Sequence, residues 1–529
     1  MLKLPDLHIA DNTQLVPSAA VCLLVVGIIA RAFLAKSESG LPLPPSPPTW
    51  RLKGHFLPQL FPSLTIAGWI EKYGPVVTIR SGFERVVLIG RYKAAVDIME
   101  NQGKFTADRP RNIAGGEIFN GGMSIVFSPF GDRFRRMRRA LHSHLQPKAA
   151  EVYQPLQMSH ASNTVLGILD DPHNFQNHVT TYAATTIMKV AYGKTAPTSA
   201  TDPDVIALRR RIQFVQRAMI LRPGAYLVDV IPWLKYLPWY ARDLKQEFER
   251  EKKLNIGRLN LVKEKMQKDV DIGPSFMGYM LENDHLYGLT ETEMAFLSGT
   301  FFSAGSSTTF LAICAVLLAA ARFPEEQTKV QAELDAVIGR HQAPTFADQE
   351  SLPRLQAFIS EALRWRPPLP NGGGYLLVWF LHTFHNIHTA ALAHRTTHDV
   401  IWENYCIPAG TTLYADHWSI SRDPDVYPEP EEFKPQRWID DQGRLRDDLK
   451  FFVYGFGRRV CPGQHVANRS VFINSLLILW AFQLTLDPTK PLNDIGFMNG
   501  AVSDTPPCPI EFETRIPESE LRRLMQHYP

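Results

Sequence analysis

The chain has 529 residues, of which 45% are hydrophobic and 21% are charged, so it has ample apolar material for a large core and does not read as a disordered protein. Its net charge of +3 is too small for this length to indicate a nucleic-acid partner. The five cysteines are odd in number and widely spaced, which argues against a disulfide framework and a paired zinc site and leaves any special cysteine to act alone.

The first predicted element is a transmembrane anchor at residues 15–35. An apolar run begins at Leu15 and is long enough for one bilayer crossing, which takes about 20 residues. A cleaved signal peptide is the alternative, but the run leads into basic Arg31 rather than into a small-residue cleavage site. Because the basic residues after the span outnumber Lys3 before it, residues 1–14 are expected to be lumenal and the rest of the chain cytosolic.

A proline-rich hinge follows at residues 36–50. Its sequence LPLPPSPPTW cannot continue a helix and favours a stiff, extended segment between the anchor and the domain. Residues 51–529 are expected to form a folded domain that is mainly α-helical. A small β region is predicted early in that domain, at residues 75–90, where a turn signal separates two β-branched runs.

A long apolar helix is predicted to begin after Thr290. Thr290 and Glu293 have the spacing of a capping box, and no charged residue occurs from Met294 to Ala321. Its length would permit a second membrane span, but small and hydroxylated residues fill its first half and favour a helix buried in the domain. Because such residues weaken regular helical hydrogen bonding, we expect a ligand to approach the backbone there.

The stretch FVYGFGRRVCPGQHVANRS, residues 452–470, places Cys461 between a glycine-rich basic loop and the predicted start of a helix. A thiolate in this position is stabilised by the positive end of the helix dipole and by backbone N–H groups. The neighbouring glycines leave room for a bulky flat partner, so the sulfur suits a haem iron. Taken alone, such a cysteine is more often an inert buried residue, so the surrounding motifs have to show whether it is a haem ligand.

Four stretches occur along the chain in the order AGSSTT, EALR, PQRW and YGFGRRVCPG, beginning at residues 304, 361, 435 and 454. They resemble the signatures of the cytochrome P-450 family, and the resemblance covers nearly the whole chain. It implies the cytochrome P-450 fold, mainly α with a small β region, behind a single N-terminal transmembrane helix. Residues 51–529 would then be a haem-thiolate catalytic domain. The chain looks like a microsomal, fungal-type member and is similar to secondary-metabolite hydroxylases.

The resemblance implies which residues bind the cofactor, haem (iron protoporphyrin IX). Cys461 is expected to be the axial ligand of the haem iron. Arg459, two residues before it, and Arg138 are expected to pair with the haem propionates through charge-assisted hydrogen bonds. His394 stands where the family commonly places another propionate partner.

The resemblance also implies the catalytic residues, Thr308 and Ser307. Thr308 is expected to relay protons during oxygen activation, with Ser307 and ordered water in place of the acid that usually precedes the threonine. Two further departures are Phe134, where the family has a tryptophan, and Tyr454, where it often has a phenylalanine. Phe134 lacks an indole donor, so we expect weaker haem retention.

Glu361, Arg364 and Arg437 match a buried charge network of the family, whose role is structural. The substrate pocket is expected to be lined by the loop at residues 113–127, by the turn at residues 499–502 and by three residues of the long helix, namely Phe301, Phe302 and Ala304. We interpret this lining as apolar, so the substrate is expected to be a small hydrophobic molecule.

The implied reaction is monooxygenation, in which one oxygen atom of O2 enters the substrate and electrons come from NADPH. The expected partners are an NADPH-dependent cytochrome reductase and the lipid of the endoplasmic reticulum membrane, with no nucleic acid. The basic run from Arg133 to Arg139 is a candidate reductase surface, although it is equally an ordinary solvated helix face. Two alternatives are an inactive haem-binding protein and a haem-thiolate isomerase or dehydratase without a reductase. The presence of Thr308 favours the monooxygenase.

Residues 371–393, NGGGYLLVWFLHTFHNIHTAALA, separate the EALR helix from His394, where the family makes a short connection. Three histidines suggest a metal site, but their spacing would sweep about 300° around a helix, and no carboxylate accompanies them. An apolar lid is a second alternative, although it contradicts the polar chemistry of most loops. Because RPPLPNG continues cleanly into AHRTTHDV, we expect residues 373–392 to be an aberrant insertion, a retained intron or a gene-model error.

Overall fold

The computed structural model describes residues 39–50, 54–58, 62–81, 84–193, 226–368, 392–449, 452–490 and 509–528, together with residues 201–203, 206, 207, 210, 211 and 214. The predicted anchor at residues 15–35 lies outside the described residues. So do the turn at 499–502 and all but the last residue of the suspected insertion at 373–392.

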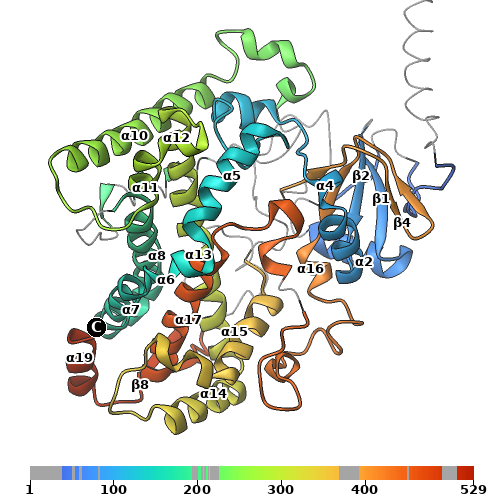
Figure 1. The fold of residues 1–529 in the computed structure, drawn as a ribbon. Coiled ribbons are helices and arrows are strands. Elements are labelled where there is room, and N and C mark those ends of the chain that lie inside the picture. The colour runs from blue at the N-terminus through green and yellow to red at the C-terminus, as the bar shows by residue number, and fades with distance from the viewer. Residues whose placement is uncertain are drawn as a thin grey trace, which may run out of the picture.

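The predicted β region forms one edge of a four-stranded sheet. β1 (Val76–Ser81) pairs antiparallel with β2 (Glu84–Ile89), which confirms the two strands expected within residues 75–90. β2 then pairs parallel with β6 (Thr412–Ala415), and β6 pairs antiparallel with β3 (His394–Arg395). The short α2 (Pro62–Tyr73) lies beside this sheet at the right of Figure 1. The sheet therefore joins the start of the domain to the segment that carries His394.

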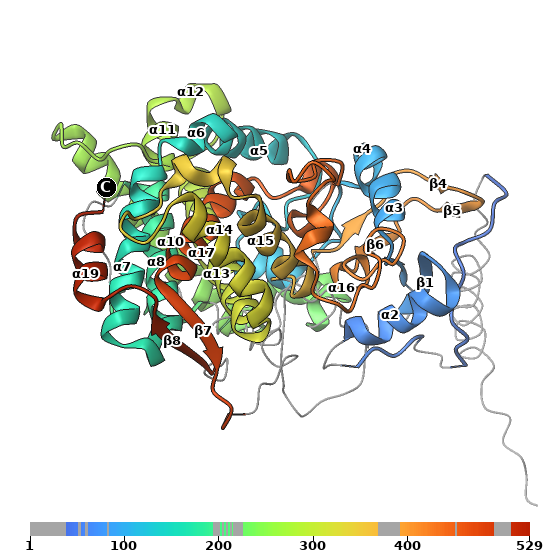
Figure 2. The same cartoon turned by 90° about the horizontal axis from the view of Figure 1, so that it is seen from below.

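Two smaller antiparallel sheets are not hydrogen-bonded to the first. β4 (Val400–Trp402) pairs with β5 (Tyr405–Ile407), and β7 (Phe482–Leu486) pairs with β8 (Ile510–Thr514). Figure 2 shows β1 and α2 at one end of the domain and β7 and β8 at the helical end.

Helices make up the rest of the domain, as the sequence indicates. The main ones are α5 (Asp132–Leu145), α6 (Pro147–Glu151), α7 (Gln154–Asp170), α8 (Phe175–Tyr192), α10 (Arg242–Gln267), α11 (Phe276–Glu282), α12 (Asp284–Tyr287), α13 (Glu291–Arg322), α14 (Pro324–Val337), α15 (Pro353–Trp365), α17 (Gln464–Ala481) and α19 (Glu518–Gln526). Short helical turns near the sheet are α3 (Tyr92–Ala95), η1 (Val96–Asn101), α4 (Gly103–Thr106) and α16 (His417–Ile420), whereas η2 (Ile113–Phe119) packs against α10. The remaining turns are η3 (Pro172–Asn174), η4 (Leu227–Asp229), η5 (Pro232–Tyr236), η6 (Phe346–Ser351), η7 (Pro435–Trp438), η8 (Phe452–Tyr454) and η9 (Gly457–Arg459).

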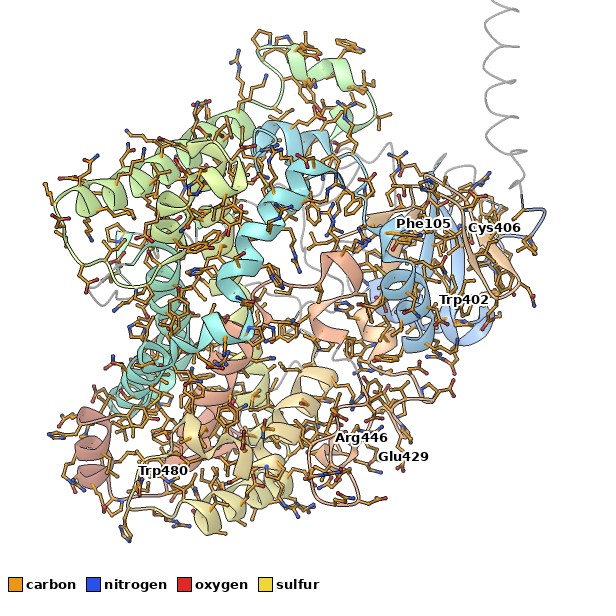
Figure 3. All side chains as sticks on the ribbon, in the orientation of Figure 1. Phe105, Trp402, Cys406, Glu429, Arg446 and Trp480 are labelled. Carbon is orange, nitrogen blue, oxygen red and sulfur yellow. The ribbon has the colours of Figure 1, made fainter. Side chains whose placement is uncertain are left out.

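Tryptophan side chains help to close both ends of the domain. Figure 3 places Trp402 with Phe105 and Cys406 at the sheet end and Trp480 at the opposite, helical end. The indole N–H of Trp480 donates to the Gly339 carbonyl at 2.8 Å, and that of Trp402 donates to the Asp97 carboxylate at 3.2 Å. Each large ring is thus buried with its one polar atom satisfied, as burial of an indole requires.

The long apolar helix, α13, runs through the domain. The predicted capping box is present, because the Thr290 hydroxyl accepts from the Glu293 N–H and the Glu293 carboxylate accepts from the Thr290 N–H. Among the described helices, α13 is the one with the length and composition to cross a membrane, yet most of its apolar stretch is buried. The expectation of a buried helix is therefore confirmed.

The hydroxyls of α13 bond to the helix backbone without breaking it. Ser303 donates to the Gly299 carbonyl at 2.9 Å, and Ser307 donates to the Ser303 carbonyl at 3.0 Å. The helix nevertheless continues unbroken from Glu291 to Arg322. The hydroxyls therefore share the helix carbonyls without interrupting the helix, and the approach of a ligand to this backbone stays a prediction.

Candidate functional site

The cysteine loop is pressed tightly against η1. Gly455 and Gly457 have φ angles of +79° and +62°, a backbone region that residues other than glycine rarely adopt. A Cβ on Gly457 would lie 2.1 Å from the Met99 carbonyl oxygen, so no larger residue fits there. The Gly457 N–H donates to the Glu100 carboxylate at 2.6 Å. These contacts fix the path of the chain just before Cys461.

Cys461 lies just before the N-terminus of α17, as predicted. Its N–H donates to the Tyr454 carbonyl at 2.9 Å, which closes the loop between the two residues. Burial raises the pKa of the Cys461 thiol, whereas the Gly463 N–H and the positive charge of Arg138 act to lower it. Because the burial effect is the largest, the protein by itself favours the thiol, and a bound cation would stabilise the thiolate.

Four basic side chains from distant parts of the chain interact beside the cysteine loop. Burial, opposed by the charge of Asp108 and assisted by that of Arg138, lowers the pKa of Arg459 to about 10. Burial and the charge of Arg459 together lower the pKa of Arg109 to about 9. The pKa of His394 is lowered well below its usual value by burial and then by Arg109. Asp108 is the carboxylate that acts on the two arginines of this cluster, Arg109 and Arg459.

Neutral backbone carbonyls bond to Arg459, Arg109 and His394 of this basic cluster but do not balance its charge. Arg459 donates to the carbonyls of Ala107 and Ser128, each at 2.7 Å, and to that of Ile125 at 3.3 Å.

The other three members of the cluster differ in their hydrogen-bond partners. His394 shares a hydrogen bond of 2.8 Å with the Thr106 carbonyl, and Arg109 donates to the Ala393 carbonyl at 2.7 Å. Within the described residues, no hydrogen bond or ion pair uses the Arg138 guanidinium. Three arginines that are buried or half-buried, with a single nearby carboxylate, fit a ligand with anionic groups such as the two propionates of haem.

Arg109 is the member of this cluster that sequence reasoning missed. Its partners Val126 and Ala393 are 17 and 284 residues away, so the contact depends on tertiary structure. A basic residue in the stretch FTADRP is the one available signal, and nothing in its spacing links it to Cys461.

On α13 the structure brings Ser307 and Thr308 to a half-buried face next to the exposed Ala304. The Thr308 hydroxyl donates to the Ala304 carbonyl at 2.9 Å, one turn earlier on the helix. Phe301 and Phe302, which were expected to line the pocket, are instead buried among helices. Neither ring therefore has the pocket-lining position that the sequence indicated.

The two misplaced phenylalanines have aromatic partners on neighbouring helices. The Phe301 ring packs edge-on against Phe276 of α11 at 5.9 Å, and the Phe302 ring packs edge-on against Tyr192 of α8 at 6.4 Å. The expectation is wrong because an apolar helix can present similar residues to a core or to a pocket, and the sequence does not distinguish the two faces.

The start of the predicted pocket loop is also packed inward. Ile113 and Phe119 of η2 are buried in a cluster with Leu244 of α10. The Asp229 carboxylate accepts from the Ile113 N–H at 2.7 Å and from the Ala114 N–H at 3.0 Å, which holds η2 in place. This part of the loop therefore supports the fold.

Glu361, Arg364 and Arg437 meet in the fold. The Arg364 guanidinium donates to both carboxylate oxygens of Glu361, each at 2.8 Å, and both side chains are fully buried. Arg437 donates to the same carboxylate at 3.1 Å. The Trp438 indole N–H and the Lys434 backbone N–H also donate to Glu361, at 2.9 and 2.8 Å, and the sequence argument did not include these two.

The comparison with protein families decides the identity of the fold. Residues 44–373 and 384–512 match the model of the family described as Cytochrome P450. The chain belongs to the cytochrome P450 family. The mainly helical domain with small sheets is consistent with the P450 fold, and the expectation of a haem-containing P450 monooxygenase is confirmed.

Fungal P450 monooxygenases are similar to this chain over most of its length. Cytochrome P450 monooxygenase 64 of Postia placenta is 45% identical over 478 residues, which cover 90% of this chain and 92% of that protein. Cytochrome P450 monooxygenase 113 of the same fungus is 42% identical over 504 residues, covering 95% and 97% of the two chains. A P450 monooxygenase of Armillaria gallica is 35% identical over 454 residues, covering 84% and 83%.

Proposed function

We propose that this P450 holds haem through the Cys461 thiolate and inserts one oxygen atom of O2 into a small hydrophobic substrate. Haem supplies the oxygen activation when bound. The observation that carries the proposal is the position of Cys461, which lies before the N-terminus of α17 with its loop fixed by glycines and its half-buried side chain in the field of Arg138.

The carbon monoxide difference spectrum of the reduced protein tests this assignment. The wild type should show the thiolate-type Soret band, and Cys461→Ala should lose it because no other side chain of the loop supplies a thiolate. His465, four residues on in α17, is the nearest substitute ligand, and its band would differ. A thiolate band that survives in Cys461→Ala would overturn the assignment. Consumption of NADPH with purified reductase then separates a monooxygenase from an inactive haem protein or an isomerase.

We propose that the basic cluster binds the two haem propionates. Arg138 has the guanidinium without a protein partner among the described residues, and it is expected to make the most direct pair. Arg459, Arg109 and His394 are already oriented by backbone carbonyls, so binding costs little further side-chain entropy.

We propose that Thr308 and Ser307 move protons on the side of the site formed by α13. Each hydroxyl donates to a helix carbonyl, and its oxygen keeps lone pairs that accept a proton donor or a water molecule. α13 carries no carboxylate between Glu293 and its end, so water has to supply the proton that an acid at residue 307 would supply. Proton delivery is therefore expected to limit coupling.

We propose that the enzyme is a single-pass protein of the endoplasmic reticulum membrane, with residues 1–14 in the lumen and the catalytic domain in the cytosol. The uncharged run in residues 15–35 and the basic residues after it support this topology. Removal of residues 1–35 should shift the protein from the membrane pellet to the soluble fraction. A truncated protein that stays in an alkali-washed pellet would contradict the single anchor.

We propose that an NADPH-dependent reductase docks against α5. Arg133 is engaged with Glu293 at 2.7 Å, and Arg136 pairs with Asp132, so the exposed Arg135 and Arg139 are the better candidates for an acidic partner. Charge reversal of these two should slow reduction of the P450 at low salt and less so at high salt. A role in fungal secondary metabolism is part of the same proposal, and product analysis with candidate hydrophobic substrates tests it.

We also propose that residues 373–392 are an aberrant insertion. The match to the family model is interrupted at residues 374–383, inside this segment, and the match resumes before His394. The sequence on the two sides joins cleanly when the segment is removed.

A further inference from the structure

The aromatic residue that opens the cysteine loop carries a hydroxyl, and that hydroxyl has a defined partner. Tyr454 replaces the phenylalanine of the family pattern, and its phenol O–H donates to the Asn468 side-chain oxygen at 2.6 Å. Asn468 lies on α17, seven residues after Cys461 and on the helix that the cysteine loop enters. A tyrosine at this position therefore ties the loop to the helix through its side chain.

The backbone of Tyr454 makes a second connection, to the cysteine itself. Its carbonyl accepts the Cys461 N–H at 2.9 Å. Tyr454 thus contacts the ligand residue through its carbonyl and the following helix through its phenol. Since Cys461 and Asn468 are joined by only seven residues of mostly helical chain, the two hydrogen bonds close a small ring, and the position of Tyr454 is set from both sides.

This hydrogen-bonded ring fixes the direction of the Cys461 N–H. The proton is directed to the Tyr454 carbonyl, while the sulfur accepts from the Gly463 N–H. An additional N–H···S hydrogen bond would withdraw electron density from a thiolate ligand, and hydrogen bonds to ligand sulfurs are a main control of the reduction potential of the metal they bind.

The phenol is suited to this role because it remains a donor. A tyrosine hydroxyl, with its usual pKa of about 10, keeps its proton throughout the physiological range.

We propose that the hydrogen bond from Tyr454 to Asn468 is a brace that positions the Cys461 thiolate by keeping the Cys461 N–H on the Tyr454 carbonyl and away from the sulfur. Tyr454 and Asn468 are then positioning residues for the haem ligand, and the inference rests on the proposed ligation by Cys461. A phenylalanine at residue 454 keeps the ring but lacks this connection to α17.

A double-mutant cycle on the haem-loaded enzyme tests the brace, with the haem reduction potential and the thermal conversion from the thiolate to the thiol form as readouts. Tyr454→Phe and Asn468→Ala should each shift the potential positive and speed the conversion. The ferric–ferrous equilibrium should change by about two- to tenfold, the effect of one neutral hydrogen bond. The double variant should show the shift of either single variant, because both remove the same bond.

Two control variants separate the brace from a general loss of stability. Asn468→Asp keeps an acceptor for the phenol, so its potential should equal or lie below that of the wild type. Tyr236→Phe removes the hydroxyl of a tyrosine that is 76% exposed on η5 and should change neither readout. Shifts that add in the double variant, or wild-type values in Tyr454→Phe, would overturn the brace. Absence of a thiolate band in the wild type would instead overturn the ligation by Cys461.

Discussion

The guanidinium carbon of Arg459 lies 3.7 Å from the centroid of the Phe134 ring. The two residues come from η9 and α5, more than 300 positions apart, and the Phe134 ring is 4% exposed. A cation held this close to a buried ring gains a cation–π interaction of about 0.5–2 kcal/mol. Phe134 therefore lacks the hydrogen-bond donor of a tryptophan but still orients an arginine that we assign to a haem propionate.

Replacement of Phe134 by leucine should speed haem loss. The change keeps an apolar side chain and removes the cation–π contact with Arg459, so the dissociation rate should rise by about 2- to 30-fold. Transfer of haem to an acceptor protein measures this rate. Tyr73→Leu is the control, because its ring lies under Lys72 at 5.5 Å on α2, outside the basic cluster. Equal rates for both variants would contradict the role of Phe134.

The features that sequence alone predicted are those set by local chemistry. The capping box of Thr290 and Glu293 needs only a three-residue spacing, and the β1–β2 hairpin needs only two β-branched runs and a turn. The position of Cys461 before α17 likewise follows from glycines close to it in sequence.

The features that sequence missed depend on which face of an element meets which neighbour. Phe301 and Phe302 have the composition of a pocket lining, but α8 and α11 cover them. Arg109 belongs to the basic cluster through contacts with Val126 and Ala393, and the second of these is 284 residues away. Such contacts arise from the packed fold and leave no periodic signal in one sequence.

Replacement of Thr308 by alanine should uncouple oxygen reduction from product formation. The variant removes the relay hydroxyl but leaves the haem cluster untouched, so haem content should be unchanged while a larger share of reduced oxygen appears as peroxide. The amounts of peroxide and of product formed per NADPH consumed measure the coupling. Thr308→Ser should restore coupling because it keeps the hydroxyl, and Ser307→Asp should improve coupling over the wild type. Unchanged coupling in Thr308→Ala would move the role to Ser307 or to water.

Removal of the Glu361 charge should strongly destabilise the domain. Glu361→Gln leaves the buried Arg364 guanidinium without its counter-ion, at a cost of about 3–5 kcal/mol in the free energy of unfolding. Denaturant unfolding, followed by tryptophan fluorescence, measures the loss. Glu429→Gln is the control, because the Glu429 side chain is 66% exposed and its pair with Lys434 is expected to contribute little.

A second variant tests the remaining contacts of this network. Arg364 also donates to the carbonyls of Ser421 and Pro430 at 2.8 Å and of Glu432 at 3.0 Å. Apolar replacement of both Glu361 and Arg364 leaves the carbonyls of Ser421 and Pro430 without this donor, whereas Arg437 still donates to that of Glu432 at 3.3 Å. Stability should therefore not recover fully. Recovery to the wild-type value would show that the ion pair is the only important part of the network.

Acid should destabilise the domain through the buried His144. Burial lowers its pKa to about 4, while the unfolded chain titrates near 6.5, and its ring is enclosed by Tyr153, Phe276 and Tyr279. Between these pKa values the unfolded state binds the proton more tightly. The free energy of unfolding should therefore fall as the pH drops from 6.5 to 4, by about 3 kcal/mol for this residue.

Unfolding measured across that pH range in His144→Gln tests this contribution. Glutamine keeps a hydrogen-bonding side chain for Tyr153 but does not titrate, so the variant should lose stability less steeply on acidification. His285→Gln, at a side chain that is 72% exposed, should keep the wild-type slope. Parallel slopes for His144→Gln and the wild type would show that other groups carry the acid sensitivity.

Deletion of residues 373–392 should give a fully active enzyme. The two sides of the segment join cleanly in sequence, and the family match is interrupted at residues 374–383. On the far side the chain re-enters the site directly, because the Ala393 carbonyl accepts from the buried Arg109. Ordering a connection of twenty extra residues at this point costs conformational entropy next to the basic cluster. The deleted form should therefore have the higher haem content.

Expression of three forms in parallel decides whether the segment belongs to the functional protein. The full chain, the 373–392 deletion and a shorter 374–383 deletion are compared by the thiolate CO band per mole of protein and by turnover with reductase. If the segment is aberrant, the 373–392 deletion has the strongest band and the highest turnover, and the shorter deletion lies between it and the full chain. A full-length enzyme that binds haem and turns over equally well would show that the segment is a genuine and tolerated part of this P450.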